Sequence, residues 1–126
     1  MQDVTCLEVP TAFVLADLVE RAKAGTLAWE PFRAGVFRHV LYDEGPEGAA
    51  AALLRYEPGA RVPRHEHVGH EHILVLAGSQ QDQRGHYGPG TMVVNPPGSS
   101  HEVFSPDGCL VLAIWQRRIR FVEPTV

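Results

Sequence analysis

The decisive stretch of this chain is residues 59–78, GARVPRHEHVGHEHILVLAG, which carries four of the seven histidines. His65 and His67 are two residues apart, so their side chains project from the same face of a strand. Gly69 permits a bend, and Glu71 then heads a strongly apolar run. Burying a carboxylate alone is costly, so Glu71 needs a partner. Two imidazoles and a carboxylate facing inward are suitable ligands for a first-row divalent metal.

A plainer interpretation exists, since a histidine-rich loop is often only solvated or binds metal adventitiously. The surrounding turn residues favour a structured site. The 126 residues include 12 Gly and 10 Pro, and turns recur about every 8–12 residues, as in β-sandwiches and barrels. The predicted strands are residues 36–42, 49–56, 61–67, 71–77, 80–87 (a strand or hairpin), 91–95, 101–105 and 109–120. Residues 73–77 are apolar at every position, which predicts burial on both faces of that strand.

One amphipathic helix is expected before the strands. Thr11 can cap a helix that runs to about Ala24, with Gly25 just past its end. Four apolar residues share one face of this helix: Leu15, Leu18, Val19 and Ala22. It should cover a flank or end of the barrel, or pack in an oligomer. We therefore predict a single domain, residues 1–126, with a helical or extended arm over 1–34 and a β-barrel over 35–126.

The composition excludes several classes of protein. Hydrophobic residues make up 44% of the chain, charged residues 21%, and the net charge is -4, an ordinary globular balance. The one basic cluster, residues 117–120, is interpreted as a solvated strand face, so no nucleic-acid partner is expected. Cys6 and Cys109 are too few and too far apart for a disulfide framework. The first ten residues lack the basic region of a signal peptide, and no apolar run is long enough for a bilayer. We expect a cytoplasmic protein that does not bind membranes.

The spacing of residues 59–78 matches a known pattern. Five residues separate Gly59 from His65, one separates His65 from His67, three separate His67 from Glu71, and six separate Glu71 from Gly78. This resembles the first motif of the cupin superfamily at every defining position.

Residues 90–101, GTMVVNPPGSSH, resemble the second cupin motif and end on His101. Cupins usually carry Asn four residues later, where this chain has Ser105, but that Asn is not a metal ligand. The resemblance implies an all-β fold, a double-stranded β-helix or jelly-roll barrel. It also implies one divalent metal ion (iron, zinc, manganese or nickel) held by four ligands: His65, His67, Glu71 and His101.

A finer resemblance, to ChrR-type cupins, lies in residues 55–67 (RYEPGARVPRHEH), residues 85–90 (GHYGPG) and the pair Gly108–Cys109. That group includes the C-terminal zinc-binding domain of ChrR-type anti-sigma factors. It also includes standalone cupins, some of which are dioxygenases that cleave carbon–carbon bonds in diketones or hydroxyketones. Residues 1–34 hold no His and one Cys, so we do not expect them to supply the zinc-binding helical domain that grips a sigma factor.

Two functions follow from these resemblances. The first is a metal-dependent, dioxygenase-type enzyme, in which a diketone or hydroxyaromatic ketone binds the metal inside the barrel. The second is a non-catalytic zinc-binding sensor with a protein partner, in which Cys109 reports oxidants. A third, lower-ranked function is isomerisation or decarboxylation of a small acid. No residue is assigned as catalytic. Cupins commonly dimerise through barrel strands, so we expect a homodimer.

Several other residues carry weaker expectations. Strand alternation sends His70 and His72 outward if Glu71 points inward, and Glu66 should also face out. Cys109 is either a buried small hydrophobe or a reactive thiol. Five residues lie on strands that could line the pocket, and their register divides them between inside and outside: Arg55, Tyr56, Met92, Phe104 and Trp115.

Overall fold

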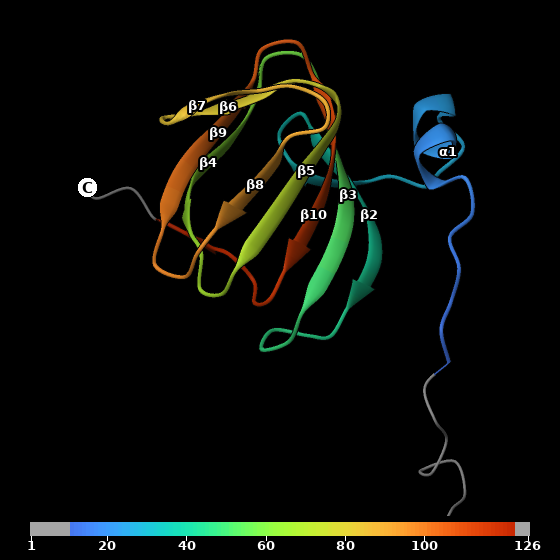
Figure 1. The fold of residues 1–126 in the computed structure, drawn as a ribbon, viewed down its shortest axis with the longest axis horizontal. Coiled ribbons are helices and arrows are strands. Elements are labelled where there is room, and N and C mark those ends of the chain that lie inside the picture. The colour runs from blue at the N-terminus through green and yellow to red at the C-terminus, as the bar shows by residue number, and fades with distance from the viewer. Residues whose placement is uncertain (1–10, 123–126) are drawn as a thin grey trace, which may run out of the picture.

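Two antiparallel sheets face each other in the computed structural model, which describes residues 11–122 (Figure 1). The six-stranded sheet has the order β1 (Glu30–Arg33), β2 (Val36–Asp43), β3 (Ala50–Tyr56), β10 (Cys109–Trp115), β5 (Glu71–Gly78) and β8 (Met92–Asn95). The five-stranded sheet has the order β11 (Arg120–Phe121), β4 (Ala60–Glu66), β9 (Ser100–Ser105), β6 (Gln80–Asp82) and β7 (Gly85–Tyr87). The predicted all-β jelly roll is confirmed, and most predicted strands agree with the observed ones within a residue or two.

The core lies between the sheets and is built from inward-facing residues of both. Its largest cluster includes Val36, Leu54, Val62, Val75 and Val111. Strand β10 is central, because it pairs with β3 on one side and β5 on the other although both precede it by dozens of residues.

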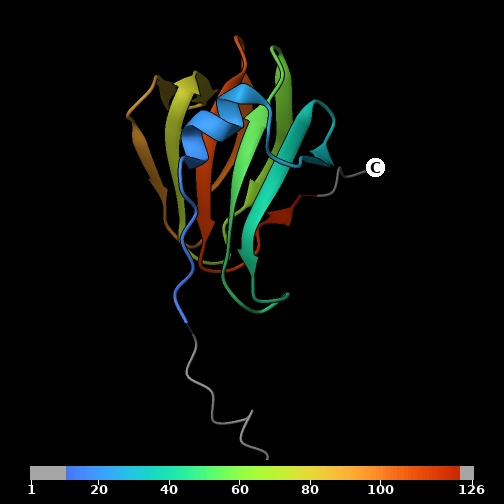
Figure 2. The same ribbon diagram turned by 90° about the vertical axis from the view of Figure 1, so that its right-hand side faces the viewer.

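A second apolar cluster explains why several strands are apolar on both faces. The helix α1 (Leu18–Ala24) lies across the outer face of the six-stranded sheet (Figure 2). Ala22 and Leu27 pack there against Leu53 and Leu110, which are all buried. The expected burial of residues 73–77 on both faces is therefore partly confirmed: Ile73 is buried inside, and the outward-facing side chains are half-buried.

The helix begins later than predicted, so Thr11 is not its cap. Asp17 precedes it with a left-handed backbone, φ 54°, and makes no side-chain capping bond. Phe13, Val14 and Leu15 are 64%, 87% and 40% exposed. A short helix needs tertiary packing to form, and packing begins only at Leu18. The predicted end is correct, because Gly25 closes the helix with φ 74°.

Two further boundaries differ from the prediction. The strand predicted over residues 109–120 breaks after Trp115, which is the last residue of β10 paired with both neighbours. Residues 116–119 then cross between the sheets, and the chain pairs with β4 as β11. Strand β1 was not predicted; it lies within the segment assigned to the arm and pairs with β2. No helix among the described residues has the length and apolar character needed to cross a bilayer.

The turn after β5 depends on a close approach between two backbones. Gly78 has φ 73°, and a Cβ there would overlap the carbonyl oxygen of Gly108. The neighbouring Ser79 N–H donates to the same carbonyl at 3.1 Å. The glycine that ends the first motif is therefore required by both conformation and space.

We predict that Gly78→Ala lowers the free energy of unfolding by about 3 kcal/mol or more, from left-handed strain plus overpacking. Gly90→Ala is the matched control, since Gly90 has φ 88° and open space around it; it should cost only about 1 kcal/mol. Urea unfolding measures both. Equal losses in the two variants would contradict the close approach.

Candidate metal centre

The four predicted ligands lie together at one end of the barrel interior. His65 comes from β4, Glu71 from β5 and His101 from β9, while His67 lies in the connection after β4. Their ligand atoms lie within 4.8 Å of one another, and all four residues are buried. Both sheets contribute, so the cluster forms only when the sheets close on each other.

Strand register explains the convergence. His65 pairs directly with His101 across β4 and β9. The connection after β4 is fixed by two backbone bonds, from the His67 N–H to the Ser99 carbonyl at 2.9 Å and from the Gly98 N–H to the His67 carbonyl at 2.8 Å. The glycine of the second motif thus holds a ligand of the first motif in place.

The outer nitrogens of His65 and His67 are fixed by backbone acceptors. Nδ1 of His65 lies 2.8 Å from the Pro63 carbonyl oxygen, and Nδ1 of His67 lies 3.1 Å from that of Ser99. A carbonyl only accepts, so both Nδ1 atoms carry the proton. The Nε2 lone pairs therefore point into the cluster, the orientation that second-sphere contacts give to metal-binding histidines.

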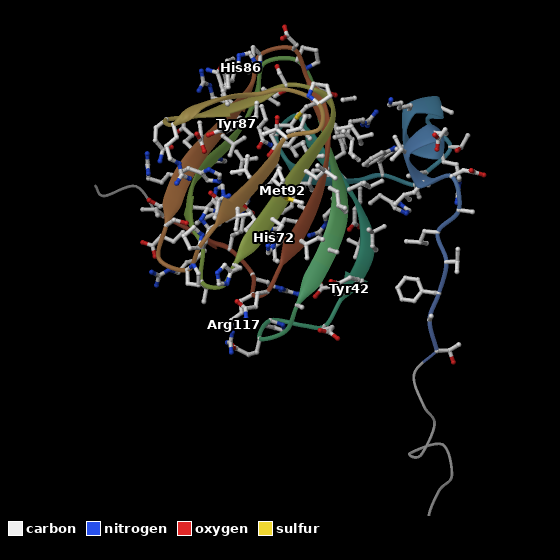
Figure 3. The ribbon with its side chains drawn as sticks, in the orientation of Figure 1. Tyr42, His72, His86, Tyr87, Met92 and Arg117 are labelled. Atoms are coloured by element: carbon white, nitrogen blue, oxygen red, sulfur yellow. The ribbon has the colours of Figure 1, made fainter. Side chains whose placement is uncertain are left out.

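Asp82 orients His101 in the same way. Its Oδ2 lies 3.0 Å from Nδ1 of His101, while its Oδ1 accepts from the Tyr87 hydroxyl and the Arg84 backbone N–H, both at 2.8 Å. Histidine, carboxylate and further donors form a continuous chain from the β6–β7 hairpin to the cluster. Figure 3 shows Tyr87 on this hairpin.

Glu71 is held as an ionised carboxylate. Its Oε1 accepts from Nδ2 of Asn95 at 3.0 Å, and its Oε2 accepts from Nε1 of Trp115 at 2.6 Å. Burial would raise the pKa of Glu71, and the Trp115 N–H opposes this effect by lowering the pKa.

Two imidazole nitrogens approach an oxygen of Glu71 with no proton donor between them and that oxygen. Nε2 of His67 lies 3.0 Å from Oε1 of Glu71, and Nε2 of His101 lies 3.8 Å from it. Both Nε2 atoms are buried and have no hydrogen-bond partner. Buried, unpaired acceptors around a carboxylate are unfavourable unless a cation lies among them. The geometry therefore fits a bound divalent metal.

Burial also favours the neutral form of two of the imidazoles, His65 and His101. It lowers the pKa of His65 to about 4. Burial likewise lowers the pKa of His101, although the Asp82 contact partly opposes it. Neutral imidazoles bind metal without first losing a proton. Three imidazole nitrogens and a carboxylate are donors that iron, zinc, manganese and nickel all accept.

A cavity adjoins three of the four ligands. It has about 20 Å³ of space for the centre of a water-sized sphere, room for about one water molecule. Its walls are Phe32, Leu54, Tyr56, Val62, His65, Glu71, Ile73, Gln80, His101, Val103, Trp115 and Ile119. Tyr56 and Trp115 thus line the interior, as two of the five strand residues considered for the pocket.

The other three strand residues do not line this cavity. Arg55 and Met92 are exposed. Phe104 lies on the outside, where the Cζ atom of Arg61 is 4.2 Å from the centroid of the Phe104 ring. The expectation that His70 and His72 face away from the cluster is confirmed: His70 is exposed, and His72 is half-buried on the outer face with Met92 nearby on β8 (Figure 3).

Four residues that support the ligands were not identified from the sequence: Asp82, Arg84, Asn95 and Ser99. Asn95 has a weak signal, a polar residue that closes an apolar strand within the second motif. Asp82 has none, because only the folding back of the β6–β7 hairpin brings it to His101.

Cys109 is a buried free cysteine. Burial raises the pKa of its thiol to about 11. The thiol is therefore protonated at neutral pH, and the reactive form is the thiolate. This environment favours the interpretation of Cys109 as a small buried hydrophobe.

We predict that Asp82→Ala weakens metal binding by about 10- to 100-fold, because His101 loses the group that orients it. Glu102→Gln is the control, since Glu102 follows His101 on β9 but is exposed and pairs with Arg61. Competition with a chromophoric chelator measures both affinities. Unchanged affinity in Asp82→Ala would show that Asp82 does not support the site.

The metal-free protein should lose stability as the pH falls from about 6.5 to about 4. His65 titrates near 6.5 when unfolded and near 4 when folded, so the unfolded chain binds more protons in this window and acid favours it. The loss from His65 is up to about 3 kcal/mol. Denaturant unfolding of the parent and of His65→Gln tests this, and an equally steep pH dependence in the variant would contradict it.

Comparison with known proteins identifies the family. The model of the ChrR cupin-like domain matches residues 19–117. The anti-sigma-E factor ChrR of Cereibacter sphaeroides is 33% identical over 109 residues, which cover 85% of this chain and 50% of that protein. The chain thus spans about half the length of this curated relative.

Solved structures show the same fold. An acetylacetone dioxygenase from Acinetobacter johnsonii superposes with a TM-score of 0.73 at 13% identity, over 92% of this chain and 80% of that one. The anti-sigma factor ChrR in complex with SigE from Rhodobacter sphaeroides superposes with a TM-score of 0.64 at 22% identity, over 88% of this chain and 72% of that one. With its fold, its two motifs and its family match, this chain belongs to the ChrR-like cupins.

Proposed function

We propose that this chain is a metal-dependent enzyme of the dioxygenase type, acting on a small diketone or hydroxyaromatic ketone. The supporting observation is the cavity beside the ligands, because His65, Glu71 and His101 form part of its wall. A ligand in that cavity would meet the metal directly. A closed structural zinc site, in contrast, needs no such space.

The residues around the cavity have two different roles in this proposal. His65, His67, Glu71 and His101 would hold the metal, which supplies Lewis acidity and, if it is iron(II), a path for electrons to dioxygen. Leu54, Val62, Ile73 and Val103 form an apolar wall that excludes water.

Tyr56 adds a polar group to this wall. Burial raises its pKa well above the ordinary value, and the charge of Glu71 adds to that rise. The phenol therefore keeps its proton and can donate a hydrogen bond to an oxygen of a bound ligand. The likeness to an acetylacetone dioxygenase agrees with a ligand that carries two such oxygens.

A zinc-binding regulatory domain is the second candidate. It is favoured by the 33% identity to an anti-sigma-E factor. In that case a protein partner replaces the substrate, and the four ligands close around zinc. The protonated state of Cys109 argues against an oxidant-sensing thiol in this role.

Elemental analysis of protein purified without added metal, followed by oxygen uptake with acetylacetone and hydroxyacetophenone, separates the two candidates. We expect about one iron, manganese or nickel per chain, and uptake with at least one substrate. Glu71→Ala should lose both the metal and the uptake. Glu66→Ala should keep both, because Glu66 lies on the outside and pairs with Arg120. Tightly held zinc without turnover, even after replacement by iron, would instead support the regulatory domain.

A further inference from the structure

A second hollow lies directly outside the metal cavity. This vestibule has a volume of about 240 Å³, measured in the same way as that of the metal cavity. It is lined by Phe32, Arg38, Asp43, Ala50, Trp115, Arg118, Ile119 and Phe121. Three of these residues, Phe32, Trp115 and Ile119, also line the metal cavity. They form the boundary between the two spaces, and we call them the constriction.

The constriction is built from three separate elements. Phe32 lies on β1, Trp115 ends β10, and Ile119 belongs to the segment 116–119 that crosses between the sheets. Trp115 is fixed, because its Nε1 donates to Glu71. Ile119 has no such polar anchor of its own, so its position depends on the segment that carries it.

Ion pairs tie that segment to the β2–β3 hairpin. Arg118 donates to both carboxylate oxygens of Asp43, at 3.3 and 3.1 Å, and Arg117 donates to Glu47 at 3.0 Å. Figure 3 shows Arg117 at the end of the barrel next to this hairpin. Exposed pairs of this kind are weak, so small displacements of Ile119 are inexpensive.

The vestibule combines aromatic walls with two guanidinium groups. Arg38 and Arg118 line it together with Asp43. Arg38 also pairs with Glu30 at 2.8 Å and Arg118 with Asp43 at 3.1 Å, so an anionic group would share these guanidiniums with the carboxylates. The guanidinium of Arg38 also lies 5.6 Å from the ring centroid of Phe32. Such a surface suits a planar, apolar group that carries a negative charge.

The small volume of the metal cavity indicates that a ligand would occupy both spaces. The metal cavity holds about one water molecule, so only the oxygen-bearing head of a ketone or enolate fits beside the ligands. The rest of the molecule must extend past the constriction. The hollow beside His70 and His72 shares only Trp115 with the metal cavity, whereas the vestibule shares three residues.

We propose that the vestibule is the outer compartment of the ligand site. A chelating ligand reaches the metal between Phe32, Trp115 and Ile119, and its body stays in the vestibule with an anionic group against Arg38 and Arg118. This inference rests on the proposed function and adds that, among chelating ketones, those with an acidic substituent bind more tightly.

The first test compares two probes that share a chelating head, catechol and 3,4-dihydroxybenzoate, on the cobalt(II)-loaded protein at low salt. The carboxylate should tighten binding by about 5-fold, a partly exposed charge contact. Arg118→Gln should abolish this preference. Arg117→Gln, which removes the same charge outside the vestibule, should retain it. Two results would overturn the proposal that the vestibule is part of the ligand site. One is equal affinity of both probes for the parent protein. The other is loss of the preference for 3,4-dihydroxybenzoate in both variants.

The second test measures how fast catechol binds and how fast a chelator removes cobalt. Ile119→Ala should raise both rates by about 10-fold, because a smaller side chain widens the constriction. Ile114→Ala is the matched control on the outer face of β10 and should leave both rates unchanged. Unchanged rates in Ile119→Ala would overturn this route while leaving the metal site intact. Failure of the parent protein to bind cobalt would overturn the proposed function itself.

Discussion

The rest of the structure depends on one contact between two acceptors. Nε2 of His67 and an oxygen of Glu71 lie 3.0 Å apart inside the barrel, and each has its other polar atoms committed elsewhere. Nδ1 of His67 is bound to Ser99, and Glu71 accepts from Asn95 and Trp115. The arrangement is unfavourable without a cation and favourable with one. The buried cluster therefore lowers the stability of the metal-free fold, and metal binding restores that stability.

Strand β10 connects the metal site to the rest of the six-stranded sheet. The strand lies between β3 and β5, so it fixes the edge of the metal site through Trp115. The chain then leaves the sheet, and the segment that follows closes the cavity with Ile119. Adjacent parts of the chain thus have two roles. Trp115, at the end of β10, holds Glu71 in place. The segment 116–119, which exposed ion pairs hold, borders the cavity through Ile119.

The two candidate functions make different uses of the same four ligands. An enzyme needs a cavity, a route to it and neutral imidazoles, and the structure has a cavity bounded by three ligands and a vestibule outside it. A regulatory domain needs a partner surface instead. Proteins of both kinds share this fold, and a shared fold does not decide function. The choice between an enzyme and a regulatory domain therefore depends on the side chains that line the cavity and the vestibule, such as Tyr56 and Ile119.

The sequence by itself determined most of the strands, because alternation along a strand decides which side chains share a face. The four candidate ligands came from the resemblance of residues 59–78 and 90–101 to the cupin motifs, and the structure brings these four residues together. The tertiary structure alone decided the rest. Asp82 reaches His101 only through the hairpin between β6 and β7. The helix starts at Leu18 because packing on the sheet, rather than propensity, stabilises a short helix. These features depend on contacts between distant segments, which local pattern does not encode.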